Sequence, residues 1–161
     1  MSTQFTGYPV AGGRSARLRE FEVWADRTSR WSGPVLVIGG SSRIRESFAR
    51  LLHREWVRPG GAFRCVDGSS PVPATSFSIL RHPDSPAAGG TLFVDPVDRL
   101  RLPDQRRLLA WLDARDVRTG SLGAPWRLVA GLDAPFGELS GAHRLLPALL
   151  DSLDKWRIDL R

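Results

Sequence analysis

The chain has 161 residues, 42% of them hydrophobic and 25% charged, a balance typical of one globular domain rather than a disordered chain. No apolar run is long enough to cross a membrane, and the first residues lack the basic-then-apolar layout of a secretory signal. A single cysteine, Cys65, excludes an internal disulfide and a cysteine-rich zinc site. We therefore expect a cytoplasmic protein without membrane contact.

The net charge is +6, from 23 Lys and Arg against 17 Asp and Glu. Residues 1–60 hold ten Arg but five acidic residues, so most of the excess lies in that part. A basic balance favours nucleic-acid binding through release of phosphate counterions. However, Lys155 is the only lysine, and so strong a preference for Arg also fits a GC-rich coding bias. The favoured interpretation is a solvated basic face.

The first third of the chain predicts a strand, a glycine loop and a helix. Residues 1–13 have no apolar period and indicate a flexible lead-in, followed by one domain over residues 14–161. Spacings near three and four predict an amphipathic helix over residues 15–30. Residues 35–38 form a short β-branched apolar run, which is typical of a strand buried on both faces. Glycines and serines at 39–42 then lead into another helical pattern.

The remainder alternates strands and helices. Helices are expected from Pro103, which suits a first helical position, and over 145–153, where Pro147 interrupts the pattern near its start. The stretch 68–90, which precedes both helices, is loop-like and rich in proline. The expected strands are 62–66, 91–95, 126–130 and 156–160. This alternation predicts an α/β fold in three layers, with about five parallel strands flanked by helices on both faces.

Four sequence blocks resemble the AAA+ domain of bacterial sigma-54-dependent transcriptional activators. VLVIGGSSRIRESFARLLHR (35–54) is similar to that family's first strand, Walker A loop and helix, typically VLITGESGTGKELVARAIH. AAGGTLFVDPVDRLRLPDQRRLLAWLDARD (87–116) resembles its Walker B region, and WRLVAGLDAP (126–135) its sensor-1 strand. LLDSLDKWRIDL (149–160) resembles the segment typically written LYYRLNVFRIDL. The resemblance covers about residues 14–160 and implies a P-loop, AAA+-like parallel sheet.

Departures from the family pattern fall on the phosphate-binding loop. The matching positions form a vestigial loop in which Ser42 and Ile44 replace glycines and Arg45 replaces the lysine. A β-branched Ile adds bulk where backbone must approach a phosphate, and the wide guanidinium fork is a poor substitute for a compact ammonium. The vestigial loop residues are Gly39, Gly40, Ser41, Ser42 and Arg45.

The positions that would support hydrolysis have changed as well. The Walker B acid Asp95 is present, but Pro96 replaces the Glu that would orient the attacking water, and Asp133 replaces the sensor Asn. Leu145 and Leu146 stand where the family has its trans-acting arginine pattern, and nothing like GAFTGA occurs between strands. We also expect no C-terminal helical lid. The resemblance therefore implies a scaffold without the family's chemistry.

The function that follows is regulatory rather than enzymatic. The sequence predicts a pseudo-ATPase without catalytic residues or cofactor, which acts by binding another protein in bacterial signalling or transcription control. The expected assembly is a monomer, dimer or hetero-complex rather than a hexamer. Two alternatives stay open: a nucleotide sensor that binds without hydrolysis, and a nucleic-acid-binding regulator.

Few other residues suggest a site. The three histidines, His53, His82 and His143, lack ligand-like spacing, and the pair Asp95 and Asp98 lacks further oxygen ligands, so no metal site is expected. Cys65 is expected to be a small buried apolar residue. Trp31 precedes a turn and is expected to be exposed, so the predicted protein-contact face, chosen for its Trp and Arg content, comprises Arg27, Arg30, Trp31 and Arg43.

Overall fold

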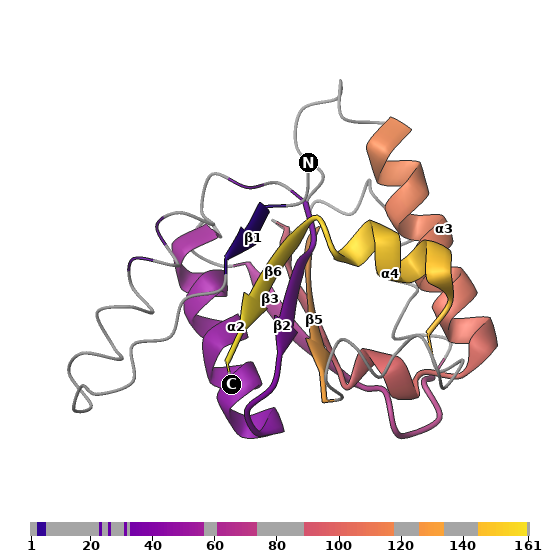
Figure 1. Ribbon diagram of the computed structural model, residues 1–161, viewed down its shortest axis with the longest axis horizontal. Helices are drawn as coiled ribbons and strands as arrows, with labels where there is room; N and C mark the ends of the chain where they lie inside the picture. The colour runs from indigo at the N-terminus through magenta and orange to yellow at the C-terminus, as the bar shows by residue number, and fades with distance from the viewer. Residues whose placement is uncertain are drawn as a thin grey trace.

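The computed structural model describes residues 3–5, 23, 26, 31, 33–56, 61–73, 89–117, 126–133 and 145–160 (Figure 1). The strands are β1 (Thr3–Phe5), β2 (Val35–Ile38), β3 (Ala62–Asp67), β4 (Gly90–Asp95), β5 (Trp126–Leu132) and β6 (Trp156–Asp159). The helices are α2 (Ser42–Trp56), α3 (Leu102–Val117) and α4 (Pro147–Leu153), with a short 3-10 turn, η3 (Val97–Arg99).

All strand pairs in the sheet are parallel, and the order is β1-β6-β2-β5-β4-β3. The five strands predicted from sequence are β2 to β6. Numbered along the chain, they lie in the order 2-3-4-1-5, which confirms the predicted parallel α/β sheet. The structure differs from the expected lead-in over residues 1–13, because Thr3–Phe5 add a sixth strand beside β6. Three residues without an apolar period give no strand signal in the sequence.

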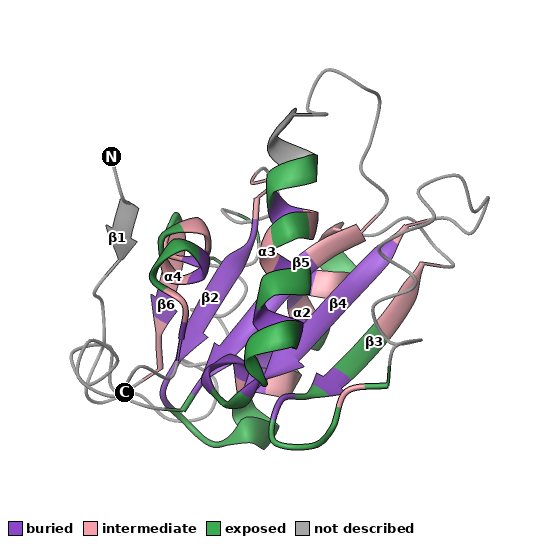
Figure 2. Ribbon diagram, turned by 90° about the vertical axis from the view of Figure 1, so that its right-hand side faces the viewer, coloured by how far each residue is buried: buried purple, intermediate pink, exposed green. Residues whose placement is uncertain are grey.

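One face of the sheet is covered by α2. The odd-numbered residues of β2, Val35 and Val37, point to this face and pack with Phe48 and Leu52 of the helix. Side chains on a strand alternate between faces, so a run of four apolar residues supplies both layers at once. Figure 2 shows the result, with β2 and β4 buried along their lengths and β3 partly exposed at the sheet edge.

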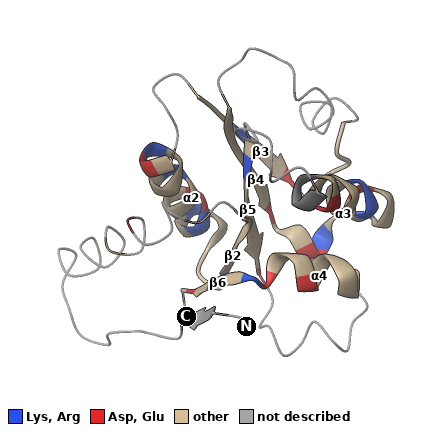
Figure 3. Ribbon diagram, turned by 90° about the horizontal axis from the view of Figure 1, so that it is seen from above, with Lys and Arg blue, Asp and Glu red and all other residues tan. Residues whose placement is uncertain are grey.

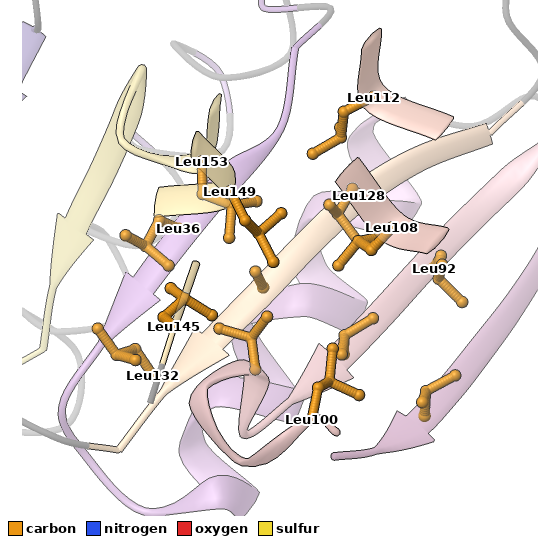
Figure 4. Close-up of a cluster of buried hydrophobic side chains, with 14 of the residues drawn as sticks. Leu36, Leu92, Leu100, Leu108, Leu112, Leu128, Leu132, Leu145, Leu149 and Leu153 are labelled. Carbon is orange, nitrogen blue, oxygen red and sulfur yellow. The ribbon is translucent and has the colours of Figure 1, made fainter. Parts of the chain in front are cut away.

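The opposite face is covered by α3 and α4, and Figure 3 shows α2 lying across the sheet from them. Leu36 of β2 belongs to this layer, together with side chains of β4 and β5. Leucines from both helices close the core over these strands (Figure 4): Leu108, Leu112, Leu149 and Leu153. The three-layer arrangement predicted from the alternation of elements is therefore confirmed.

Of two expected helices, the structure describes little of the one over 15–30 and places the start of the one over 145–153 at Pro147. The helix expected over 15–30 lies outside the described residues except at Val23 and Asp26, which are helical. Pro147 does not interrupt a helix but begins one, because proline lacks only an N–H that has no partner in a first turn. Among the helices that the structure describes, none is long and apolar enough to span a membrane.

Candidate functional site: the Walker A and Walker B positions

The β2–α2 loop turns on two glycines with left-handed backbone. Gly39 has φ 78° and Gly40 has φ 64°, a region that residues with a Cβ rarely adopt. The Ser41 carbonyl oxygen accepts hydrogen bonds from the N–H groups of Ile44 (2.9 Å) and Arg45 (3.0 Å) as α2 begins. The predicted succession of buried strand, glycine loop and helix is therefore present.

Arg45 points inward from the first turns of α2, and only 2% of the residue is exposed. Its Nε donates to Asp95 Oδ1 at 2.6 Å, and its Nη2 donates to Asp95 Oδ2 at 3.2 Å. Two parallel charge-assisted bonds of this kind are among the strongest polar contacts in proteins. The pair joins α2 to the carboxyl end of β4.

The third nitrogen of Arg45 binds the glycine loop itself. Nη1 donates to the carbonyl oxygens of Gly40 (2.8 Å) and Gly39 (3.1 Å) and lies 3.5 Å from Asp133 Oδ1. A phosphate-binding loop directs N–H groups toward its anion. Here two carbonyl oxygens face the loop's interior, so the loop is arranged around a cation that the chain itself supplies.

Opposite charges alternate along the carboxyl edge of the sheet. Asp133, just after β5, contacts both Arg45 and the Nη2 of Arg99 in η3, the latter at 3.4 Å. Asp95 also accepts a hydrogen bond from the Ser42 hydroxyl at 2.5 Å. The residues Asp95, Arg45, Asp133 and Arg99 thus form a chain of ion pairs, called the ion-pair chain below, which connects α2, β4, β5 and η3.

Solved structures share this architecture, whereas no family model and no curated protein matches the chain. NtrX from Brucella abortus aligns with TM-score 0.68 and 17% identity over 99% of this chain and 38% of its own. The same protein in complex with ATP gives 0.67 and 17% over 95% and 37%. The P-loop NTPase domain of a sigma-54 transport activator from E. coli gives 0.58 and 21% over 80% and 97%.

The chain has an AAA+ fold. The resemblance to sigma-54 activators is thereby confirmed at the level of the fold. The chain spans little more than a third of NtrX. The ion-pair chain lies on the segments that match the Walker A, Walker B and sensor-1 blocks of the family.

A cleft of about 420 Å³ opens beside the ion-pair chain. Its walls include Glu46 and the carboxylates of Asp95 and Asp133, while its two guanidinium groups, Arg45 and Arg99, belong to the ion-pair chain. Asp67, at the end of β3, is a further carboxylate, and hydrogen bonds from Ser69 and Ser70 hold its pKa below the ordinary value. Among the described residues that line this cleft, neither cation is free of an acidic partner, which makes it unfavourable for an anion.

Cys65 also lines the cleft, and its expected burial is wrong. It is an exposed, free cysteine on β3. Because β3 is an edge strand, only Val66 of its six residues is fully buried. Partial desolvation and then the nearby Glu46 charge raise the pKa of the Cys65 thiol. The sequence of a short apolar strand does not reveal whether it lies at the edge of its sheet.

The structure describes only part of the predicted contact face. Arg27 and Arg30 lie outside the described residues, and Arg43 is exposed as expected. Trp31 is instead half-buried: its ring stacks on Trp156 with centroids 5.5 Å apart, and its Nε1 donates to the Pro34 carbonyl oxygen at 2.9 Å. A tryptophan beside a turn can fold back onto the sheet edge, so Trp31 serves packing there.

The histidines and acids bring no metal centre together within the described part of the chain. His53 lies against Thr91, with Nδ1 and Oγ1 3.0 Å apart, and burial lowers its pKa. His82 and His143 fall outside the described residues. Asp98 lies in η3 with 3% exposure and is not among the residues that line the cleft with Asp95.

Replacing Asp98 with an apolar residue is expected to stabilise the fold. Neither carboxylate oxygen of Asp98 has a hydrogen-bond partner among the residues that the structure describes. Burying an unsatisfied polar group costs about 1–3 kcal/mol, and a charge costs more. We expect Asp98→Leu to raise the free energy of unfolding by about 1–3 kcal/mol in urea titrations. Asp98→Asn should gain less, because a buried amide also needs partners; a loss of stability in both variants would contradict this assignment.

Proposed function

We propose that this chain is a non-catalytic AAA+-like regulatory domain, a pseudo-ATPase that acts by binding another protein in bacterial signalling or transcription control. The observation that carries the proposal is the Arg45–Asp95 ion pair (2.6 Å) inside the former phosphate loop. In this family the equivalent lysine and acid are expected to hold phosphate and magnesium. Here the Arg45 and Asp95 side chains instead bind each other.

Three further features support the loss of hydrolysis. The loop carbonyl oxygens of Gly39 and Gly40 face the guanidinium, so a nucleotide phosphate would meet acceptors rather than donors. Pro96 follows Asp95 and has no carboxylate with which to position water. Asp133 adds negative charge near the same place. A nucleotide would have to break the ion-pair chain before its phosphates could enter.

Nucleotide binding and turnover test the proposal directly. We expect millimolar ATP or ADP with Mg²⁺ to leave the thermal unfolding midpoint of the purified protein unchanged, because a ligand that does not bind the native state adds no stability. We also expect no phosphate release above that of the Asp95→Ala variant. ATP turnover that this substitution abolishes would overturn the proposal.

The same experiment tests the nucleotide-sensor alternative, and a salt titration of binding tests the nucleic-acid alternative. A rise in the unfolding midpoint without phosphate release would assign the chain to the nucleotide sensors, and Arg45 would then be the first residue to substitute. Nucleic-acid binding predicts an affinity that falls steeply with salt. The acidic cleft beside the ion-pair chain favours neither alternative.

A further inference from the structure

The outward side of α2 carries arginines in a row. Arg43, Arg50 and Arg54 are exposed and follow one another at spacings of seven and four, which places them on one side of a helix. Phe48 and Leu52 are buried on the opposite side. These three arginines, the α2 arginine row, extend over about 16 Å at 1.5 Å per residue.

Most of the charge in this row is uncompensated. Arg50 pairs with Glu46 at 2.7 Å, as helix neighbours often do. Arg43 and Arg54 form no ion pair with any residue that the structure describes. The row therefore presents two free guanidinium groups, one at each end, and suits an anionic partner.

An exposed apolar side chain lies beside the row. Ile44 follows Arg43 and is 47% exposed. Ile44 Cγ2 and Leu160 both lie about 3.6 Å from the position of a Cβ on Gly40, so all three meet at the mouth of the glycine loop. An apolar residue flanked by arginine is a common feature of protein-binding surfaces.

The base of this surface is fixed from inside. Arg45, next to Arg43 and Ile44, is held by Asp95 and by two loop carbonyl oxygens. The first turn of α2 is thus anchored to the sheet without any ligand. A surface that is already ordered loses little conformational entropy when a partner binds.

We propose that the α2 arginine row and Ile44 bind an acidic segment of a partner protein, which places carboxylates along the row and one apolar side chain on Ile44. This inference rests on the proposed protein-binding function and names its surface. A protein segment fits better than nucleic acid, because an aliphatic residue lies at the end of the row and no described aromatic residue of α2 is exposed.

Helix α3 provides a matched comparison on the other face of the sheet (Figure 3). Leu102 is 46% exposed, almost the same as Ile44, and Arg106 is exposed nearby. However, Arg107 is paired with Asp104 at 3.1 Å, which leaves Arg106 as the one unpaired arginine among the described side chains of α3. Leu102 and Arg106 therefore serve as controls of equal chemistry.

The test uses the full chain and a fluorescent acidic peptide. The peptide, of about 15 residues so that it can form a helix, consists of Glu and Ala with one central Leu. We expect binding in fluorescence anisotropy that weakens as salt rises. The double variant Arg43→Glu/Arg54→Glu should weaken it at least about tenfold, which is about 1.4 kcal/mol, and Ile44→Ser several-fold. Leu102→Ser and Arg106→Glu should leave it unchanged.

Three results would overturn the inference: no binding at millimolar protein, an equal loss in the α3 variants, or tighter binding of a short DNA duplex through the same arginines. The last would assign the row to nucleic acid. Circular dichroism of each variant checks that the helix content of the whole protein is unchanged. ATP turnover would refute the proposed pseudo-ATPase function and leave the peptide result standing, so the two failures are distinguishable.

Discussion

Replacing Arg45 with methionine is expected to be among the most destabilising single substitutions in this chain. The substitution leaves Asp95, whose side chain is 3% exposed, as a buried charge without its cation. Removing one partner of a buried ion pair costs about 3–5 kcal/mol, because the remaining charge keeps its desolvation penalty. Urea unfolding followed by tryptophan fluorescence should show a loss of this size in the free energy of unfolding.

Two companion variants distinguish the effect of losing the buried ion pair from the effect of losing an arginine on α2. Arg50→Met removes a guanidinium on the same helix, but its exposed contacts, the pair with Glu46 and a cation–π contact with Phe63, should together cost only about 1 kcal/mol or less. Arg45→Met/Asp95→Asn removes both charges and should be more stable than Arg45→Met alone. Equal losses for Arg45→Met and Arg50→Met would show that the buried pair carries no stability.

The scaffold was predictable because its signals are local. The β-branched run of β2, the glycines after it and the 3.6-residue spacing of Phe48 and Leu52 each predict their own element. The alternation of such elements then restricts the topology to a parallel sheet. Where prediction differed, as at Pro147, the local rule was right about proline and the helix boundary was misplaced by two residues.

The content of the site was not predictable in the same way. The sequence shows Arg45 at a lysine position and Asp133 at an asparagine position as two separate losses. In the fold they compensate each other, since Asp133 and Asp95 both face the guanidinium. The sequence did contain a signal for this contact. Arg45 is longer than the lysine it replaces, Asp133 carries a charge that the asparagine lacks, and the two lie on segments that meet in the family's fold. Local sequence patterns cannot show that the Arg45 side chain points into the protein.

Burial at the sheet margins depends on tertiary neighbours for the same reason. Cys65 is exposed because none of the described strands lies beyond β3, and Trp31 is half-buried because Trp156 of β6 lies under it. Neither neighbour is close in the sequence. The residues chosen for a contact face by residue type alone therefore have different roles: Trp31 packs against the sheet, whereas Arg43 is exposed on α2.

We expect a substitution at Gly131 to destabilise the protein as much as one at Arg45, because both disturb the Arg45–Asp95 ion pair. Gly131 lies in the central strand β5, where a Cβ would overlap Asp95 Oδ1 and lie 3.1 Å from Arg45 Nε. The Asp95 carboxylate could avoid it only by leaving the guanidinium. Overpacking alone costs about 1–3 kcal/mol, so with a weakened ion pair we expect Gly131→Ala to lose about 3 kcal/mol or more in urea unfolding.

The decisive comparison repeats Gly131→Ala in the Arg45→Met background. Once the guanidinium is gone, the Asp95 side chain is free to rotate away from the new methyl group, so the second substitution should cost about 1 kcal/mol or less. Strong non-additivity would mean that Gly131 is required because the ion pair fills the space beside it. If the two losses simply add, the glycine is needed for strand packing alone, and the carboxylate is not held in place by Arg45.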